Sequence, residues 1–483
     1  MHMTREQLAA AAAELPRLYI EAGPGSGKTV VAASRFGVMR FGSLKDRRGV
    51  AALSFTRSAT AELRQRVVRR WGTTSVSPPN RISTIDALFA DMLRFSLADG
   101  VVEWPNSHVD LQVRDDWSTV QETRLSDRLS ELTVLGKKVV VRESQLKESV
   151  RQIKSETYRE LIHAGHCTHE DVRNVMRSVF GQYDLRERLG SWLANNYKAL
   201  VIDEVFDAND LDLDLISLAS GRGIPVALIG DPWQALYEFR GARPDLVPKR
   251  LAGLGFTRID LTRSFRFAET QRSGTERARA GKPVELEFGE ATDVDVVLCT
   301  RWSPLLDGER GILPLALGGT KSPAWALATL ALDAVAFATI GSHAIDVATA
   351  LRRLGLEEKM DPVALRLLHG STLSALREGS PEAATKAAWS SIIEWVVLHG
   401  GVRKQPNRRR QQLLSMRKIL LQISAPTVGL SVHQAKGLEW ERVGLLLQEG
   451  ESEALARGLS KDSESERKLY VALTRAKVQT LIV

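Results

Sequence analysis

The sequence predicts an α/β protein in which parallel sheets are flanked by helices, and three observations support this. A glycine-rich loop at residues 21–31 separates a short apolar run from a helical pattern. Three further apolar runs, GVAALSFT (49–56), KALVIDE (198–204) and IPVALIGD (224–231), each end in polar residues, as strands buried on both faces do. Helical patterns such as residues 58–71 lie between these runs. Strands that alternate with helices indicate a doubly wound core.

The pattern is repeated in the second half of the chain, which predicts a second domain of the same class. DVDVVLCT (293–300) and APTVGLSV (425–432) are apolar runs, and the sequence ends in another, VQTLIV. Two long stretches without such runs interrupt the pattern, and we interpret both as helical insertions. The predicted domains are 1–90 with 196–265, and 266–345 with 415–483; the predicted insertions are 91–195 and a smaller one at 346–414.

The composition is typical of a soluble protein with a basic surface. The 483 residues carry a formal net charge of +8, which favours polyanionic partners but is common in proteins that bind no nucleic acid. The two cysteines, Cys167 and Cys299, exclude a disulfide framework and a four-cysteine metal site. The N-terminus has no signal-peptide pattern, and the apolar window 324–340 contains Asp333 and falls short of the roughly 20 residues of a membrane span. We expect a cytoplasmic protein without a membrane partner, and a buried helix at 324–340.

The first loop fits the P-loop pattern, Ala-x4-Gly-Lys-Thr, between a strand and a helix. Its glycines let backbone N–H groups turn around a phosphate, beside the positive end of the helix. Lys28 would reach the outer phosphates, and the Thr29 hydroxyl would hold Mg²⁺. The alternative is a glycine turn without function, which the Lys-Thr pair and the strand–helix setting disfavour. The predicted cradle consists of Ala22, Gly23, Pro24, Gly25, Ser26, Gly27, Lys28 and Thr29.

An acidic pair follows another predicted buried strand, where a P-loop needs its partner. In VIDE (201–204), Asp203 would hold the magnesium through water, and Glu204 would orient and deprotonate the attacking water. Such a pair is common by itself. Together with the P-loop it indicates hydrolysis rather than nucleotide binding alone.

The segment IGDPWQALYEFRGA (229–242) follows the next predicted strand. Gln234 can sense a γ-phosphate or its water, while Tyr237 and Phe239 offer flat faces on which bases can stack. General ATPase chemistry does not require aromatic residues here. Their presence indicates a machine that couples the phosphate state to a single strand.

Together these motifs resemble those of superfamily 1 helicases of the UvrD/Rep type. The resemblance implies two RecA-like domains that use ATP and Mg²⁺ and bind single-stranded DNA or a tailed duplex. The matching segments are TREQLAAAA (4–12), the P-loop, SFTRSATAELRQR (54–66), DPWQALYEFRGA (231–242), LTRSFRF (261–267), SVHQAKGLEWERV (431–443) and SERKLYVALTRAK (465–477). The implied DNA-contacting residues are Phe55, Thr56, Arg57, Tyr237, Phe239, Arg240, His433 and Lys436.

The resemblance also implies further nucleotide contacts. Gln7 would read the adenine, and Glu439 would lie near the ribose. Arg266 and Arg475 would reach the γ-phosphate from two domains, together with Lys28. Arginines supplied across a cleft stabilise the transition-state charge and make closure depend on ATP.

The implied activity is ATP- and Mg²⁺-dependent translocation or unwinding of DNA, 3′ to 5′, in repair, recombination or defence. One alternative is a DNA-stimulated ATPase that regulates a partner nuclease without processive unwinding. An alternative of another class is a non-catalytic nucleic-acid-binding protein with a relic P-loop. The presence of Lys28, Glu204, Arg266 and Arg475 argues against that last alternative.

Three features depart from the family pattern. Phe206 stands where the family usually has a glutamine, so the coupling of ATP to DNA is expected to change. Asp86 stands where it usually has a histidine, and a carboxylate facing a phosphate would repel it. The insertion at 346–414 is much smaller than the family's accessory domain. We therefore expect translocation rather than processive unwinding.

Two other signals have competing interpretations. HAGHCTHE (163–170) gathers His163, His166, Cys167 and His169, which could hold a metal, but a solvated helix end is the favoured interpretation. The basic run 403–412 could contact a phosphate backbone or form a solvated loop, and these two interpretations stay open.

Overall fold

The computed structural model divides into two compact units, Met1–Arg266 and Phe267–Val483. The residues that it describes are 3–43, 45–117, 120, 123–307, 309–318, 322–356, 361–401, 409–422 and 425–483. Of the basic run at 403–412, residues 403–408 therefore lie outside the described part of the chain.

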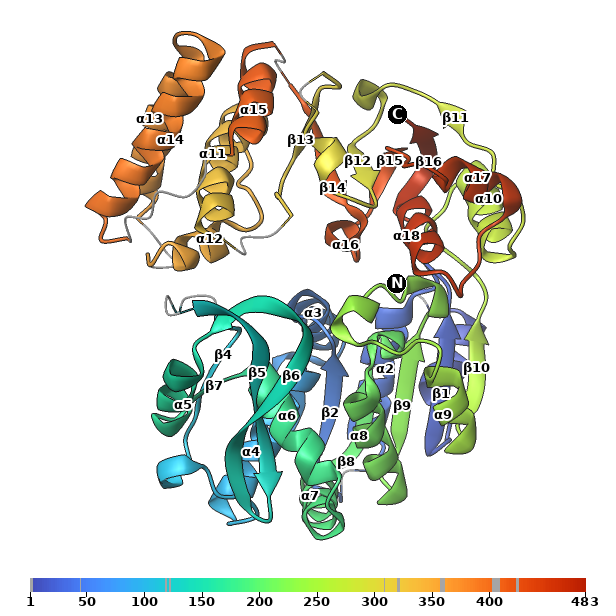
Figure 1. The fold of residues 1–483 in the computed structure, drawn as a ribbon. Coiled ribbons are helices and arrows are strands. Elements are labelled where there is room, and N and C mark those ends of the chain that lie inside the picture. Colours follow the sequence, from blue (N-terminus) through green and yellow to red (C-terminus); the bar gives the residue numbers. More distant parts are fainter. Residues whose placement is uncertain are drawn as a thin grey trace. The chain divides into compact units, whose positions relative to one another are not determined.

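A six-stranded sheet forms the centre of the first unit, with the strand order β10-β1-β9-β8-β2-β3 (Figure 1). All of its neighbouring strands pair in parallel. The strands are β1 (Arg17–Ala22), β2 (Gly49–Ser54), β3 (Arg81–Thr84), β8 (Tyr197–Ile202), β9 (Val226–Gly230) and β10 (Thr257–Leu261). The apolar runs expected to form strands are β2, β8 and β9, so this part of the fold prediction is confirmed.

Helices cover both faces of this sheet, and β2 shows why its sequence is apolar throughout. Val50 and Ala52 pack into a core with α1, α2 and α3, whereas Ala51 and Leu53 pack into a second core with α4, α6, α7 and α8. Successive side chains of a strand point to opposite faces, so a strand covered on both faces carries no polar alternation. The helices are α1 (Arg5–Ala12), α2 (Lys28–Phe41), α3 (Arg57–Trp71), α4 (Ile85–Ala98), α6 (His169–Phe180), α7 (Tyr183–Asn196), α8 (Asp210–Gly221) and α9 (Val247–Gly253).

The insertion at 91–195 was predicted to be helical, and for residues 123–153 this prediction is wrong. Strands β5 (Thr123–Leu135) and β6 (Lys138–Ile153) form a long antiparallel hairpin. Val134 pairs with Val139 and both are buried, whereas polar and charged residues dominate the rest of the hairpin and hide the two-residue period. The insertion also contains β4 (Gln112–Arg114), α5 (Ser155–His163) and β7 (His166–Thr168).

The second unit has its own six-stranded parallel sheet, with the order β11-β16-β15-β12-β14-β13 (Figure 1). Its strands are β11 (Glu287–Phe288), β12 (Val296–Cys299), β13 (Ile312–Pro314), β14 (Thr427–Ser431), β15 (Trp440–Leu445) and β16 (Ala476–Ile482). The apolar runs at 293–300, 425–432 and the end of the sequence form β12, β14 and β16. Two parallel sheets flanked by helices confirm the predicted α/β class.

A helical cluster packs beside β13 in this unit, around a core that includes Leu313 of that strand and Leu368, Trp389 and Met416. The cluster consists of α11 (Pro323–Ile340), α12 (Val347–Arg353), α13 (Pro362–Arg377), α14 (Pro381–Leu398) and α15 (Arg410–Gln422). The other helices of the unit are α10 (Glu269–Arg279), α16 (Val432–Ala435), α17 (Glu451–Arg457) and α18 (Glu464–Leu473).

Helix α11 is the predicted apolar helix at 324–340. Among the described residues it is the one helix long and apolar enough to cross a membrane, and 67% of it is buried inside the protein. Its buried residues run from Ala324 to Ala336 and form part of the helical cluster's core. These properties agree with the predicted buried helix.

Candidate nucleotide-binding site

The P-loop joins the carboxyl end of β1 to α2, and its backbone requires glycine at two positions. Gly25 and Gly27 have φ angles of 73° and 86°, in the left-handed region that favours glycine. A Cβ added at Gly27 would lie 2.5 Å from Gln7 Nε2, and one added at Gly25 would lie 2.5 Å from Arg266 Cβ. The loop is thus closely surrounded by two residues that are distant in sequence.

Lys28 connects the P-loop to the segments that follow two neighbouring strands. Its Nζ donates a hydrogen bond of 3.0 Å to Gln234 Oε1 and lies 3.6 Å from Glu204 Oε1. Gln234 Nε2 in turn donates to Asp231 Oδ2 at 2.9 Å. The structure therefore brings together three residues that were predicted from separate motifs. The amide and carboxylate oxygens around Lys28 take the place that phosphate oxygens can take.

The acidic pair lies at the end of β8. Asp203 is buried, and its burial together with the charge of Glu204 raises the pKa of the Asp203 carboxyl to about 7, against the opposing effect of Lys28. Glu204 has φ 60° and ψ 43°, one of three non-glycine residues with positive φ in the described chain. Residues held in this region store about 1–3 kcal/mol of strain and cluster at functional sites. The strained backbone accompanies the approach of Glu204 to Lys28.

The residues present fit a magnesium–nucleotide. Thr29 offers a hydroxyl on the first turn of α2, and Asp203 offers a carboxylate, both of them the oxygen ligands that Mg²⁺ prefers. A cation beside Asp203 would favour the charged carboxylate, which burial alone disfavours. When bound, the ion would neutralise charge on the outer phosphates.

Gln7 is buried and held against the P-loop. Its Nε2 donates a hydrogen bond of 2.8 Å to the carbonyl oxygen of Ser26, while its Oε1 accepts one of 3.0 Å from the backbone N–H of Thr4. Thr4 Oγ1 accepts in return from the N–H of Gln7, which completes a capping box at the start of α1. The amide that was predicted to read adenine thus lies beside the loop that would hold the phosphates.

The segment after β10 is bonded directly to the P-loop. Phe265 N–H donates to the carbonyl of Gly25 at 2.9 Å, and Ser264 Oγ donates to that of Pro24 at 2.9 Å. Arg266 is consequently next to the loop. It is also the last residue of the first unit, whereas the sequence placed it at the start of the second domain.

The predicted DNA-contacting residues of the first unit lie at the ends of β2 and β9. Phe55 packs against the larger core of the unit, and Thr56 caps α3 by accepting a hydrogen bond of 3.2 Å from the N–H of Ala59. Arg57 is exposed and forms an ion pair with Asp115. Of these three, Arg57 is best placed to contact a ligand from solvent.

A small aromatic group follows Gln234. The rings of Tyr237 and Phe239 lie 5.9 Å apart, and the Arg240 guanidinium carbon lies 5.2 Å and 5.5 Å from their centroids. Phe239 is 65% exposed. These three predicted DNA contacts therefore form one cation–π cluster a few residues after the glutamine that binds Lys28.

The remaining predicted contacts lie in the second unit. Arg475 is buried and donates hydrogen bonds to the carbonyl of Val471 at 3.0 Å and to Thr474 Oγ1 at 2.9 Å. The other three are His433 in α16, and Lys436 and Glu439 in the turn before β15. That these four residues contact a nucleotide or DNA remains a prediction.

The Phe206 departure has a structural explanation. Phe206 is 2% exposed, and its ring packs edge-on against Tyr19 of β1, with the centroids 6.1 Å apart. A Cβ added at Gly230 would lie 2.9 Å from its ring. At this position the chain has a core residue, which does not face the nucleotide.

The Asp86 departure is explained by an ion pair that no sequence motif indicates. Arg173 Nε of α6 donates a hydrogen bond of 2.6 Å to Asp86 Oδ1. Arg173 Nη1 also lies 3.1 Å from Asp212 Oδ1 of α8. Asp86 therefore belongs to a charge network between three helices, and a phosphate contact at this position is not supported.

The structure favours the solvated helix end over a metal site for the HAGHCTHE residues. The Cys167 thiol is buried, which raises its pKa to about 12 and disfavours the thiolate. His169 Nε2 lies 3.7 Å from Asp115, and His166 Nδ1 lies 3.5 Å from an Arg114 nitrogen. Among the described residues, the three side chains that could hold a metal ion are Asp333, His343 and His369 of the second unit.

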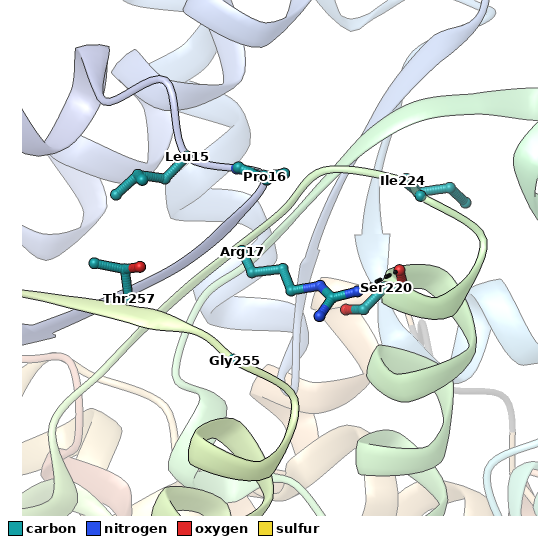
Figure 2. Close-up of a pocket in the computed structure, with 8 residues that line it drawn as sticks. Leu15, Pro16, Arg17, Ser220, Ile224, Gly255 and Thr257 are labelled. Atoms are coloured by element: carbon teal, nitrogen blue, oxygen red, sulfur yellow. Dashed lines mark hydrogen bonds between the residues drawn. The ribbon is translucent and has the colours of Figure 1, made fainter.

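A cavity of about 420 Å³ lies at the amino-terminal ends of β1, β9 and β10, away from the P-loop (Figure 2). Arg17 crosses it and donates hydrogen bonds to the carbonyls of Leu254 at 2.7 Å and Ser220 at 3.3 Å. Ligands of open parallel sheets bind at the carboxyl ends of strands, so this cavity is separate from the nucleotide site. It is lined by Leu15, Pro16, Arg17, Ser220, Gly223, Ile224, Gly255 and Thr257.

Known proteins resemble this chain over limited parts of their length. A probable DNA helicase II homolog of Mycoplasma capricolum subsp. capricolum is 26% identical over 47% of this chain and 34% of that protein. The ATP-dependent DNA helicase Rep of Salmonella typhimurium is 25% identical over 46% of this chain and 35% of that protein. The chain thus matches about a third of the length of these curated relatives.

Among solved structures, the arterivirus nonstructural protein 10 helicase with DNA aligns with 99% of this chain and 62% of its own, at 10% identity and a TM-score of 0.32. The fold assignment rests on the two sheets described above. Two family models match the sequence. The UvrD/REP helicase N-terminal domain matches residues 3–189 and 184–250, and the UvrD-like helicase C-terminal domain matches residues 411–483. Because the first model alone covers more than half of the 483 residues, the chain belongs to the UvrD/REP helicase family.

Proposed function

We propose that the protein is an ATP- and Mg²⁺-dependent translocase on single-stranded DNA that moves 3′ to 5′. The observation that carries the proposal is the position of Lys28 Nζ, 3.0 Å from Gln234 Oε1 and 3.6 Å from Glu204 Oε1. One cation thereby joins the P-loop, the acidic pair and the segment that continues into the aromatic cluster. A translocase needs such a connection between ATP hydrolysis and the surface that binds DNA.

Each residue has a distinct role in this proposal. Lys28 exchanges its amide and carboxylate partners for outer phosphate oxygens when the nucleotide binds. Glu204 accepts a proton from the attacking water. Gln234 loses its bond to Lys28 at the same moment, and Tyr237 and Phe239 lie only three and five residues further along the chain. A change at the γ-phosphate can thus reach a base-stacking surface through a short segment.

ATP turnover with and without single-stranded DNA tests the enzyme itself. Lys28→Ala and Glu204→Gln should each abolish turnover and leave the circular dichroism spectrum unchanged. Arg177→Ala is the matched control, because Arg177 is an exposed residue of α6 that pairs with Glu170. Unchanged turnover in either site variant would refute the assignment, and a relic P-loop predicts no turnover in the parent protein.

Streptavidin displacement tests the movement and its direction. A 3′-to-5′ translocase removes streptavidin from a biotin at the 5′ end of a single strand and leaves it on a 3′ end. Faster removal from the 3′ end would reverse the proposed polarity. DNA-stimulated turnover without displacement from either end would instead support an ATPase switch that regulates a partner such as a nuclease.

A further inference from the structure

A buried carboxylate in the helical cluster of the second unit has no lysine or arginine partner among the residues that the structure describes. Asp333 lies in the middle of the apolar helix α11, and its side chain is 1% exposed. Among the described residues its ion-pair partners are two histidines, His343 and His369. A buried carboxylate without compensating charge is strongly unfavourable, and a bound cation is one way to balance it.

The two histidines converge on Asp333 from different elements (Figure 1 shows α11 and α13). His343 Nδ1 lies 3.0 Å and 3.3 Å from the two carboxylate oxygens, and His369 Nε2 of α13 lies 2.8 Å from Oδ2. One ligand atom from each residue can be chosen so that all three lie within 4.8 Å of one another. Ligands of a tetrahedral zinc ion, bound at about 2.0–2.1 Å, are separated by about 3.3 Å. Only small shifts separate the observed arrangement from a coordination sphere.

The surrounding structure holds these groups in place. Gly341 ends α11 with φ 67°, and the chain then turns so that the N–H of Ala344 donates a hydrogen bond of 2.8 Å to Asp333 Oδ1. The ring of Phe337, one turn after Asp333, lies 4.9 Å from that of His343 and 5.5 Å from that of His369. Backbone and ring contacts of this kind fix the orientation of metal ligands.

One histidine is buried and the other is exposed, an arrangement that would allow an ion to enter from solvent. His369 is 5% exposed, and its Nδ1 has no hydrogen-bond partner among the described residues, so its polar contact there is the one that Nε2 makes with Asp333. The His343 side chain is 56% exposed, which gives an ion access from solvent and leaves room for a water molecule as a fourth ligand.

We propose that Asp333, His343 and His369 bind one zinc ion that fastens α11, the loop after it and α13 to one another. Two imidazoles and one carboxylate form a ligand set that binds Zn²⁺, unlike the oxygen ligands of the nucleotide site. The ion neutralises the buried carboxylate, and each histidine moves its proton to the other ring nitrogen or to solvent. The site joins helices of the cluster and lies outside the P-loop unit.

Cobalt titration of the full chain tests the site, because Co²⁺ replaces Zn²⁺ in such sites and reports tetrahedral geometry through its visible spectrum. The protein is first stripped with a chelator and then titrated without nucleotide. We expect one equivalent of tetrahedral Co²⁺, displaced by Zn²⁺. His343→Ala should weaken binding at least about tenfold, since loss of an outer-shell partner alone has an effect of about 10–100-fold. The control is His399→Ala. His399 lies at the exposed end of α14 and hydrogen-bonds to the carbonyl of Trp395, so this variant should bind Co²⁺ as tightly as the parent does.

His343→Cys tests whether residue 343 binds the metal itself. A histidine that only hydrogen-bonds to Asp333 would not produce the expected spectrum when it is replaced by cysteine. The substitution replaces one ligand by another, so stoichiometric binding should persist and a thiolate-to-cobalt absorption band should appear in the near ultraviolet. Neither substitution touches a buried residue, so both variants should fold, which circular dichroism checks. The proposal is overturned if the parent binds no stoichiometric Co²⁺, if His343→Ala binds as tightly as His399→Ala, or if His343→Cys shows no thiolate band. Any of these results would leave a hydrogen-bonded histidine–carboxylate cluster, and none bears on the ATPase.

Discussion

Arg173 Nε donates a hydrogen bond of 2.6 Å to Asp86 Oδ1, and the same guanidinium lies 3.1 Å from Asp212. Burial raises the pKa of the Asp212 carboxyl, and the charge of Arg173 opposes this effect. The pair joins α6 of the insertion to α4 and α8, which pack on the sheet. Arg173 thus holds Asp86, which stands where the family pattern usually has a histidine, in a structural ion pair.

We predict that Arg173→Met lowers the free energy of unfolding by about 3–5 kcal/mol, because it leaves the buried carboxylate of Asp212 without its partner. Urea denaturation measures this change. The control is Arg177→Met on the same helix, whose exposed pair with Glu170 should contribute at most about 1 kcal/mol. Equal effects of the two substitutions would show that the network does not stabilise the fold.

Glu204 permits a test that separates backbone strain from chemistry. Its φ of 60° suits glycine better than any other residue. We predict that Glu204→Gly is more stable than Glu204→Ala by about 0.5–1 kcal/mol, since alanine keeps the left-handed penalty and glycine relieves it at a smaller entropic cost. Both variants should lack ATP turnover. A more stable alanine variant in urea denaturation would contradict the strained geometry.

Gly27 tests the close packing of Gln7 on the P-loop. Gly27→Ala should weaken nucleotide binding at least about tenfold, or about 1.4 kcal/mol, because its Cβ would displace the Gln7 amide from Ser26. Binding is measured with a fluorescent ATP analogue. Gly100→Ala is the control, since Gly100 also has a positive φ, 62°, but a Cβ there meets nothing within 4 Å. It should lose stability and keep its nucleotide affinity.

The fold class and the strands that carry the site could be predicted because local sequence determines them. A strand buried on both faces must be apolar throughout, and a phosphate loop must carry glycines and Lys28. The hairpin could not be predicted, since Val134 and Val139 are buried within a run whose other residues are mostly polar or charged. Their inward alternation becomes visible only once the partner strand is known.

Side-chain clusters built from distant residues were missed for a related reason. Arg173 and Asp86 are 87 residues apart, and His369 and Asp333 are 36 apart, so no spacing rule connects them. The compact HAGHCTHE segment suggested a metal site instead, although its cysteine is buried and His166 and His169 contact Arg114 and Asp115. Residues predicted from contiguous motifs do come together. Lys28, Glu204 and Gln234 meet because each follows a parallel strand, and the carboxyl ends of neighbouring parallel strands lie on the same side of the sheet.

Phe206 decides whether the departure in the acidic motif alters the coupling of ATP to DNA. Because its ring is 2% exposed and packs against Tyr19, we predict that Phe206→Leu changes the DNA stimulation of ATP turnover by less than about twofold, or roughly 0.4 kcal/mol. Phe206→Ala should instead lower the free energy of unfolding by about 3–5 kcal/mol, as expected for a large cavity in the core. Turnover is measured at saturating single-stranded DNA and compared with its DNA-free value. A Phe206→Leu protein that is as stable as the parent but loses its DNA stimulation would place this ring in the coupling path, and the packing explanation would then be insufficient.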